Sequence, residues 1–340
     1  MNLVALVHSD LHVCVRYRLL AFRDVLKSAG YSLILQELPR AALDRMRMYR
    51  TTGDVDAVIL QRNLLSLPEL LVLRLSAKKL IFDFDDAIWM RDSYNPRGFY
   101  SSKQDYRFRF LMRSVNAVVA GNDYLADKAR ECVRKAHVVT IPTCVNPDRY
   151  PVAEPRSIAS VQMVWVGSQS TLQGLEQFRD CLEVIGQRVP GIRLKMICDR
   201  FLTFQNLPVD AVPWSAETEA REIADADIGI SWIPDDPWSR GKCGLKILQY
   251  QAAGLPVVTN PIGVHTAMVR NNETGFLATT TEEWVHAIQQ LATSAELRHQ
   301  LGTAGRQQVF TDYSVAAGGR MWVAMLDKLL HQTPGGVADV

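Results

Sequence analysis

The sequence predicts an α/β protein with two doubly wound parallel sheets in series, because short apolar runs alternate with helical segments twice along the chain. The runs are apolar throughout, as is typical of strands that are buried on both faces. A proline-rich linker at residues 142–155 separates the two series. The length of 340 residues also favours two domains, since one domain usually takes roughly 100–200 residues.

Six strands are expected in the first half of the chain. Between the first two, residues 16–29 are predicted to form one helix with an apolar face, which Gly30 ends at a C-cap. The six apolar runs are residues 3–7, 31–35, 57–60, 80–84, 117–120 and 138–141.

The second half repeats the alternation and then becomes helical. Its strands are expected at 162–166, 193–197, 211–212, 227–231 and 256–259, and the pattern becomes helical after residues 275–278. Its helices are expected at 171–187, 242–253, 282–291, 295–309 and 315–330. The predicted domains are residues 1–150 and 151–314, followed by a terminal helix at 315–331 and a disordered tail at 332–340.

Composition and charge exclude several classes of protein. The net charge of +2 argues against a protein that coats nucleic acid, although residues 1–150 sum to +7 and residues 151–340 to −5. No run reaches the ~18–20 apolar residues of a membrane-spanning helix, and the first residues do not resemble a secretory signal, so we expect a cytoplasmic protein. The six cysteines are scattered without a C-x-x-C pair, which predicts reduced structural thiols rather than zinc ligands or disulfides.

Residues 237–260 carry the strongest functional signal. Gly241 is predicted to open a helix on which Lys242, Lys246 and Gln249 share one face, with Arg240 just before it. Free N–H groups, the positive end of the helix dipole and three cations would then meet at one place, which indicates a phosphate site. The alternative interpretation is a solvated surface helix that happens to carry two lysines.

Several motifs in this half resemble a known family. The motifs are Gly244-Leu245, QYQAAGLPVV at 249–258, NETGFL at 272–277, a strand that runs into a glycine turn at 164–167, and the closing residues 306–314. Together they resemble glycosyltransferase family 4, the group 1 glycosyltransferases. The resemblance implies the GT-B fold, in which two Rossmann-like domains face each other across a cleft and the C-terminal helices pack back toward the first domain.

The resemblance also implies an activity. Family members transfer a sugar from a nucleotide-diphosphate sugar to an acceptor hydroxyl, with retention of configuration and without metal or other cofactor. Residues 1–150 would take the acceptor and residues 151–314 the sugar nucleotide. We therefore expect a hexosyltransferase-type enzyme of cell-surface polysaccharide or glycolipid synthesis.

The chain departs from the family pattern at its two glutamates, whose places are taken by Gly241 and Gln249. Gln249 is expected to hydrogen-bond the ribose through its amide. The usual Arg and Lys pair after the first strand of the second domain is also missing, so the cations of the Gly-Lys-Cys-Gly-x-Lys segment at 241–246 are expected to replace it, as a subtype of the family. The predicted donor-binding residues are Gly167, Ser168, Ser170, Thr171, Asp199, Arg200, Arg240, Lys242, Gly244, Lys246 and Gln249.

Polar residues follow the strands of the first half as well. The expected acceptor-side residues are Asp10, His12, Arg16, Arg62 and Asn122, and the expected catalytic residues are His8, Asp85, Asp86, Arg240 and Lys242. The carboxylates at 83–86 are also open to other interpretations. They match a D-x-D metal motif and a phosphatase nucleophile loop weakly, and they fit a turn in which Asp86 caps a short helix equally well. No metal is expected.

The basic first half suggests an acceptor that is anionic or carried by a membrane, with a peripheral position at the inner face of the membrane. Its two local basic clusters are Arg40, Arg45, Arg47 and Arg50, and Lys103, Arg107, Arg109 and Arg113. Contact with anionic head groups and a plain solvated surface explain them equally well. The alternatives to a transferase are a sugar-nucleotide epimerase or hydrolase of the same fold, and a non-catalytic accessory protein that binds sugar nucleotides.

Overall fold

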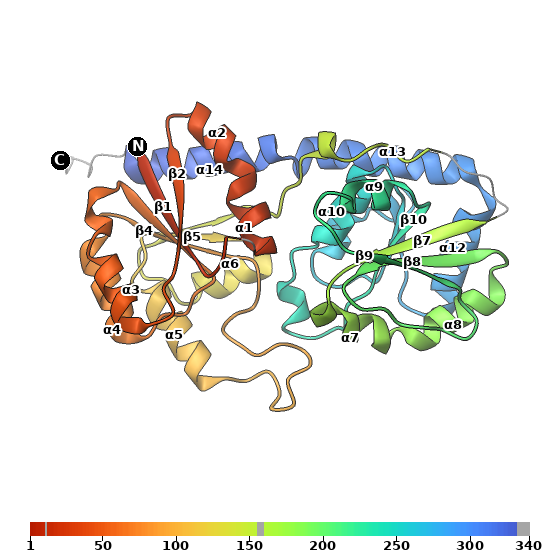
Figure 1. Ribbon diagram of the computed structural model, residues 1–340, viewed down its shortest axis with the longest axis horizontal. Coiled ribbons are helices and arrows are strands. Elements are labelled where there is room, and N and C mark those ends of the chain that lie inside the picture. The colour runs from red at the N-terminus through yellow and green to blue at the C-terminus, as the bar shows by residue number, and fades with distance from the viewer. Residues whose placement is uncertain (11, 155–159, 332–340) are drawn as a thin grey trace, which may run out of the picture. The chain divides into compact units, whose positions relative to one another are not determined.

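The computed structural model describes residues 1–10, 12–154 and 160–331 (Figure 1). The tail predicted at 332–340 lies outside these residues. The chain divides into two compact units. The first comprises residues 1–144, residues 241–243 and the chain from Val315 on, and the second comprises Val145–Arg240 and Gly244–Ser314.

The first unit is built on a parallel six-stranded sheet in the order β2-β1-β3-β4-β5-β6. The strands are β1 (Asn2–Val7), β2 (Ser32–Glu37), β3 (Ala57–Gln61), β4 (Leu80–Phe84), β5 (Ala117–Ala120) and β6 (His137–Thr140). The order reverses beside β1, which is the mark of a doubly wound sheet. The predicted parallel sheet is confirmed, and β4 and β5 match the expected bounds at both ends.

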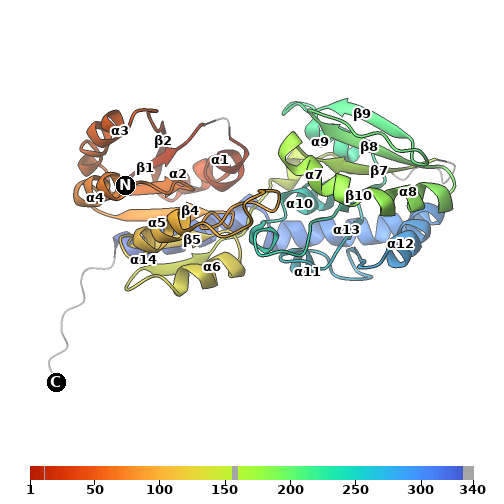
Figure 2. The ribbon, with the colours of Figure 1, turned by 90° about the horizontal axis from the view of Figure 1, so that it is seen from below.

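Helices lie on both sides of this sheet (Figure 2). They are α1 (Val13–Arg18), α2 (Arg23–Ser28), α3 (Ala42–Tyr49), α4 (Leu67–Ser76), α5 (Ser102–Met112), α6 (Asp123–Arg130) and α14 (Val315–Leu330). Although α14 is the last helix of the chain, its Trp322, Met325 and Leu326 pack in the same core as Phe22. The end of the described chain is therefore part of the first unit.

The prediction of a single helix at 16–29 is wrong. A 3-10 turn at Leu20–Phe22 separates α1 from α2, and Leu19 leaves the helical conformation with φ −127°. At the break the backbone N–H of Phe22 donates to the carbonyl oxygen of Leu19 at 3.1 Å, the tighter bonding of a 3-10 turn, and both side chains pack in one core with Trp322 of the distant α14. Gly30 follows α2 with φ +88°, as a C-cap glycine should.

The second unit has its own parallel six-stranded sheet in the order β12-β11-β10-β7-β8-β9. The strands are β7 (Val161–Val166), β8 (Ile192–Cys198), β9 (Val209–Pro213), β10 (Ile228–Ser231), β11 (Val257–Thr259) and β12 (Gly275–Leu277). The helices are α7 (Gln169–Gln177), α8 (Arg179–Arg188), α9 (Glu219–Ala224), α10 (Leu245–Ala252), α11 (His265–Met268), α12 (Thr281–Thr293) and α13 (Ala295–Asp312). The helix expected at 171–187 breaks at Phe178, whose ring packs 4.6 Å from that of Trp284 in the core.

Helix α10 starts later in the chain than the sequence predicts. This helix begins at Leu245, because Gly244 before it has a left-handed backbone with φ +64°, which an α-helix cannot continue through. Gly241 belongs instead to a 3-10 turn at Ser239–Gly241. Lys242 is therefore not on the helix, and the prediction that it shares a face with Lys246 and Gln249 is wrong.

Close packing of α13 against the end of α10 gives a first test of the second unit. Alanine at Gly302 would bring its Cβ into the carbonyl oxygen of Gly254, a backbone atom that cannot move aside easily. We expect Gly302→Ala to lower the free energy of unfolding by about 1–3 kcal/mol, the usual cost of overpacking. Urea denaturation measures this, with the exposed Thr303→Ala on the same helix as control. Equal stabilities of the two variants would show that the helices are not packed this closely.

All six cysteines are buried and unpaired, which confirms structural thiols. Within residues 1–10, 12–154 and 160–331, every helix is too short or too polar to cross a lipid bilayer.

Candidate functional site

A polar loop follows β7 at the carboxyl edge of the second sheet. Gly167 allows the chain to turn there, since a Cβ at this position would collide with the indole of Trp165 and the hydroxyl of Thr171. Ser168 then caps α7 in a reciprocal capping box with Thr171, and its hydroxyl lies 2.8 Å from that of Ser170. The four predicted residues Gly167, Ser168, Ser170 and Thr171 thus form one ordered turn at a helix N-terminus, a place that suits an anion.

Asp199 holds this turn from the next strand. It follows β8, and its carboxylate accepts a hydrogen bond of 2.6 Å from the backbone N–H of Gln169. The hydrogen bond from the Cys198 thiol is the largest cause of the lowered pKa of Asp199, and the bond from Gln169 lowers this pKa further. Arg200, beside it, is exposed. Asp199 therefore supports the loop, a role that the sequence did not indicate.

Helix α10 is fastened to the same edge of the sheet. The hydroxyl of Tyr250 accepts a hydrogen bond of 2.9 Å from the backbone N–H of Val166, the last residue of β7. One turn earlier on the helix, the ammonium nitrogen of Lys246 lies 4.4 Å from the centre of the Trp165 ring, in a cation–π contact. The structure thus brings Lys246 next to the turn at Gly167, as the phosphate-site prediction requires.

Two other predicted donor-binding residues, Gln249 and Arg240, are engaged by other side chains of the protein. Gln249 is only 2% exposed, and its side-chain amide donates a hydrogen bond of 3.3 Å to the hydroxyl of Tyr150. It therefore does not lie on an open polar face, contrary to prediction. Arg240 is half exposed and forms an ion pair of 2.9 Å with Asp235.

His265 completes this edge, and no motif in the sequence indicated it. Its Nδ1 lies 2.6 Å from the hydroxyl oxygen of Thr259 and 3.1 Å from the carbonyl oxygen of Asn260. The Thr259 hydroxyl donates its one hydrogen to the carbonyl of Ser231, so Nδ1 must carry the proton that is shared with Thr259 and Asn260. Burial, opposed by the bond to Asn260, lowers the pKa of His265 to about 4.

The lowered pKa of His265 predicts a pH-dependent stability. Below pH 6.5 the unfolded chain takes up a proton that the folded imidazole does not bind until about pH 4, so stability falls between these values as the pH falls. Between about pH 7.5 and pH 5 we expect this residue to cost about 2 kcal/mol. Urea denaturation at both pH values, compared with His265→Gln, isolates the contribution. An equal loss in both proteins would mean that His265 is charged in the folded state.

A buried ion pair lies beneath the carboxyl edge of the first sheet. Arg18 at the end of α1 and Asp83 in β4 are both 0% exposed, and their side chains meet at 2.5 Å. Arg18 also donates a hydrogen bond of 2.5 Å to the carbonyl oxygen of Ile141, just after β6. The pair therefore joins α1, β4 and the segment after β6, so Asp83 is a structural residue rather than a metal ligand or nucleophile.

A second charged cluster lies directly above this pair. Arg62 donates to Asp86 at 2.6 Å and lies 3.2 Å from Asp85, and the ammonium of Lys242 lies 3.0 Å from Asp86. Burial opposes ionisation of Asp85, but the positive charges of Arg62 and Arg18 outweigh it and lower its pKa. We call these four residues the Arg62 cluster. Asp86 caps no helix, contrary to one of the predicted alternatives, because the next helix of the described chain is α5, which begins only at Ser102.

The backbone of Arg62 supports this arrangement. Its φ is +54°, an uncommon left-handed conformation for a residue other than glycine. Asn122 caps α6 through its side-chain oxygen and donates a hydrogen bond of 3.0 Å to the carbonyl oxygen of Lys242. Lys242 is thus held within the first unit through both its side chain and its backbone carbonyl. Two of the predicted acceptor-side residues, Arg62 and Asn122, meet three predicted catalytic residues here, namely Asp85, Asp86 and Lys242.

The remaining predicted residues of the first unit lie around the end of β1. His12 caps α1 by accepting a hydrogen bond of 3.2 Å from the backbone N–H of Cys14. Arg16 lies over the ring of Tyr17, 5.1 Å from its centre. The backbone N–H of Asp10 donates a bond of 2.8 Å to Glu37. His12 is therefore explained as a capping residue.

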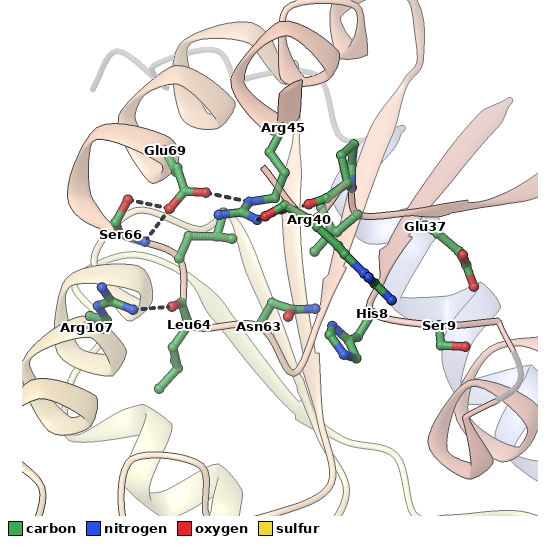
Figure 3. A pocket seen from close by; sticks show the side chains of 13 residues that line it. His8, Ser9, Glu37, Arg40, Arg45, Asn63, Leu64, Ser66, Glu69 and Arg107 are labelled. Atoms are coloured by element: carbon green, nitrogen blue, oxygen red, sulfur yellow. Dashed lines mark hydrogen bonds and ion pairs between the residues drawn. The ribbon is translucent and has the colours of Figure 1, made fainter. Parts of the chain in front are cut away.

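His8 lies instead in the wall of a cavity of about 790 Å³ (Figure 3). The cavity opens at the carboxyl ends of β1, β2 and β3, and is lined by His8, Ser9, Glu37, Leu38, Pro39, Arg40, Arg45, Asn63, Leu64, Leu65, Ser66, Glu69 and Arg107. Of the predicted site residues only His8 lines it. Some lining residues that were not predicted, such as Asn63, come just after a strand. Ligands bind there in doubly wound sheets, so this position was the available sequence signal.

No metal centre is apparent in the part of the chain that the structure describes, since no three His, Cys, Asp or Glu side chains there are grouped to hold an ion.

Comparison with known structures defines the class of the fold as GT-B. Sucrose-phosphate synthase from Thermosynechococcus elongatus is similar with a TM-score of 0.77 and 14% identity, over 98% of this chain and 100% of that chain. HepE from Anabaena, in complex with UDP and glucose, is similar with a TM-score of 0.72 and 14% identity, over 96% of this chain and 100% of that chain. A glycosyltransferase from Rickettsia africae has a TM-score of 0.72 and 14% identity, over 98% of this chain and 99% of that chain.

The sequence itself matches a family over part of its length. Residues 237–308 match the profile described as Glycosyl transferases group 1. This segment begins before α10 and ends within α13, so it contains Lys246 and His265. No curated protein matches the chain. The family match and the shared fold together support a glycosyltransferase.

Proposed function

We propose that this protein transfers a sugar from a nucleotide-diphosphate sugar to an acceptor hydroxyl. The observation that carries the proposal is the group 1 glycosyl transferase match over residues 237–308. The geometry of the same segment supports it, because Lys246 lies at the carboxyl edge of the second sheet beside the turn at Gly167. The structure of HepE, which has a similar fold, contains UDP and glucose, so UDP-sugars are the first donors to test.

In this proposal the second unit binds the donor. The N–H and hydroxyl groups of the Gly167–Thr171 turn would receive the diphosphate, and Lys246 would stabilise the negative charge that develops on the leaving nucleotide. The reaction needs no metal when such fixed donors and cations are present. Arg240 and Arg200 are exposed enough to reach a ligand, but Arg240 would have to leave Asp235.

The role of the Arg62 cluster is to position groups rather than to remove a proton. Asp85 and Asp86 are both ion-paired, and the lowered pKa of Asp85 makes it a weak base. We therefore assign Asp85 and Asp86 the task of holding Arg62 and Lys242 in place.

The finer assignments are family 4 membership, the subtype marked by Gly-Lys-Cys-Gly-x-Lys at 241–246, hexosyl transfer with retention, and a place in cell-surface polysaccharide or glycolipid synthesis. They follow from the resemblance of the motifs. A thermal-shift panel of nucleotides and sugar nucleotides, followed by a turnover assay with the strongest binder, tests the activity itself. Binding without turnover would favour an accessory protein, and turnover to an epimer or free sugar would favour the rival enzymes.

We also propose a cytoplasmic protein that touches anionic membranes through its basic first unit. Arg47, Arg50, Lys103 and Arg113 are exposed there, and each cation near an anionic surface adds about 1 kcal/mol. Co-sedimentation with phosphatidylglycerol vesicles should therefore weaken as salt is raised. Binding that is absent at low salt, or unchanged by salt, contradicts this contact.

A further inference from the structure

The two basic clusters of the first half meet in one cavity. Arg40 follows β2 and Arg45 lies on α3, whereas Arg107 lies on α5, more than sixty residues later in the chain; all three line the cavity with His8 (Figure 3). The volume of about 790 Å³ is within the range of about 300–1,000 Å³ that is usual for small-molecule sites. The clusters thus supply a concave site as well as an outer surface.

The charges in the cavity do not cancel. Arg45 is neutralised by Glu69 at 2.6 Å, and Glu69 is further held by the backbone N–H of Ser66 at 3.1 Å. This ion pair links α3 to α4. Glu69 is only 5% exposed. Glu37 is turned to the backbone N–H of Asp10, which is the main reason that its pKa is lowered.

Two of the guanidinium groups that line the cavity have no carboxylate partner among the described residues. Within the described residues neither Arg40 nor Arg107 meets a carboxylate, and Arg107 donates only to the carbonyl oxygen of Leu64, at 3.2 Å. Their sequence neighbours behave differently, since Arg47 is paired with Asp44 and Arg109 with Asp105. Figure 3 shows the end of the Arg40 side chain directed toward His8, with Arg107 at the opposite wall. The cavity therefore has two guanidinium groups without a carboxylate partner in the described chain, a net charge of +1 from its three arginines and two glutamates, and several neutral hydrogen-bonding groups.

We propose that this cavity binds the acceptor, and that the acceptor is a saccharide carrying an oxyanion, either a phosphate or a carboxylate. A guanidinium matches both groups with two parallel N–H donors, and its charge is concentrated by the concave wall. Asn63 and Ser66 supply donors and acceptors for sugar hydroxyls, and Glu37 adds an acceptor. The identification of the ligand as the acceptor rests on the proposed function, whereas binding of the anionic sugar does not.

The test uses the full chain without any donor. Isothermal titration compares glucose, glucose 6-phosphate, glucuronate and inorganic phosphate, for the wild type, Arg40→Gln and Arg107→Gln. Arg130→Gln is the control, because Arg130 is a surface arginine on α6 paired with Asp127, outside the cavity. We expect at least one anionic sugar to bind about ten-fold more tightly than glucose, and each cavity variant to lose about ten-fold while the control loses nothing.

The pattern among the probes identifies the oxyanion. Tight binding of glucose 6-phosphate together with competition by inorganic phosphate indicates a phosphate, and tight binding of glucuronate alone indicates a carboxylate. Equal affinity for glucose and both anionic sugars, no binding of either, or an equal loss in Arg130→Gln overturns the proposal. So does a loss of vesicle binding in Arg40→Gln with sugar binding unchanged. Sugar binding that depends on Arg40 in a protein without transferase activity would refute the proposed function and leave this site standing.

Discussion

Replacement of Asp83 by alanine is expected to lower the free energy of unfolding by about 3–5 kcal/mol, because it leaves a fully buried guanidinium without its counter-ion. Arg18 and Asp83 are both 0% exposed, so water cannot take the place of the lost carboxylate. The effect should also reach beyond β4, since Arg18 joins α1 to the segment after β6 through Ile141. Urea denaturation followed by far-UV circular dichroism measures it.

Asp105→Ala is the matched control for Asp83→Ala. It removes a carboxylate from an i,i+4 pair with Arg109 in which the arginine is 43% exposed, and such pairs contribute about 1 kcal/mol or less. If Asp83→Ala does not fold, Asp83→Asn provides the measurement, since the amide oxygen still accepts from Arg18 but the charge is gone. A loss below about 1 kcal/mol in both Asp83 variants contradicts the buried pair.

Replacement of Lys246 by alanine is expected to lower kcat/KM for the nucleotide sugar by about 100-fold or more, the effect of removing one fixed charge-stabilising group. Lys246 is placed beside the turn at Gly167 by its contact with Trp165 and by the anchoring of α10 to β7 through Tyr250. Lys246→Arg should recover part of the activity, since it keeps the charge. Steady-state release of nucleotide diphosphate, measured with the best donor, tests both variants.

Arg221→Ala is the control for the change in charge, because Arg221 is an exposed residue of α9 in the same unit. It should leave kcat/KM within about two-fold, since exposed charges contribute little. Wild-type kcat/KM in Lys246→Ala, with an unchanged melting temperature, would remove Lys246 from the donor site and contradict the assigned phosphate site.

The sheets were largely predictable from the sequence. The runs at 80–84 and 117–120 form β4 and β5 with the expected bounds, because strands buried on both faces are apolar at every position. The helices were less predictable where tertiary burial overrides local pattern. Leu19 and Phe178 interrupt helices whose sequences contain neither Gly nor Pro at the break, and both side chains lie in cores with residues that are distant in the sequence.

The candidate site was predictable where it is local and not where it is assembled over long distances. The turn at Gly167 and the lysine of α10 follow from residues close in sequence. The position of Lys242 does not, because the left-handed backbone of Gly244 redirects the chain before the helix begins. The pair of Arg18 and Asp83, 65 residues apart, and the convergence of Arg40 and Arg107 depend on the order of the strands, which one sequence does not reveal.

The most direct test of the central claim follows both products of one reaction. The purified full-length protein is incubated with UDP-glucose and related nucleotide sugars and with a set of neutral and anionic saccharide acceptors. The account predicts that nucleotide diphosphate is released in equal amount to a new glycosidic bond, seen by NMR as an anomeric signal with the configuration of the donor. Release that yields only free sugar, or tight nucleotide binding without any release for every donor, would contradict a glycosyltransferase.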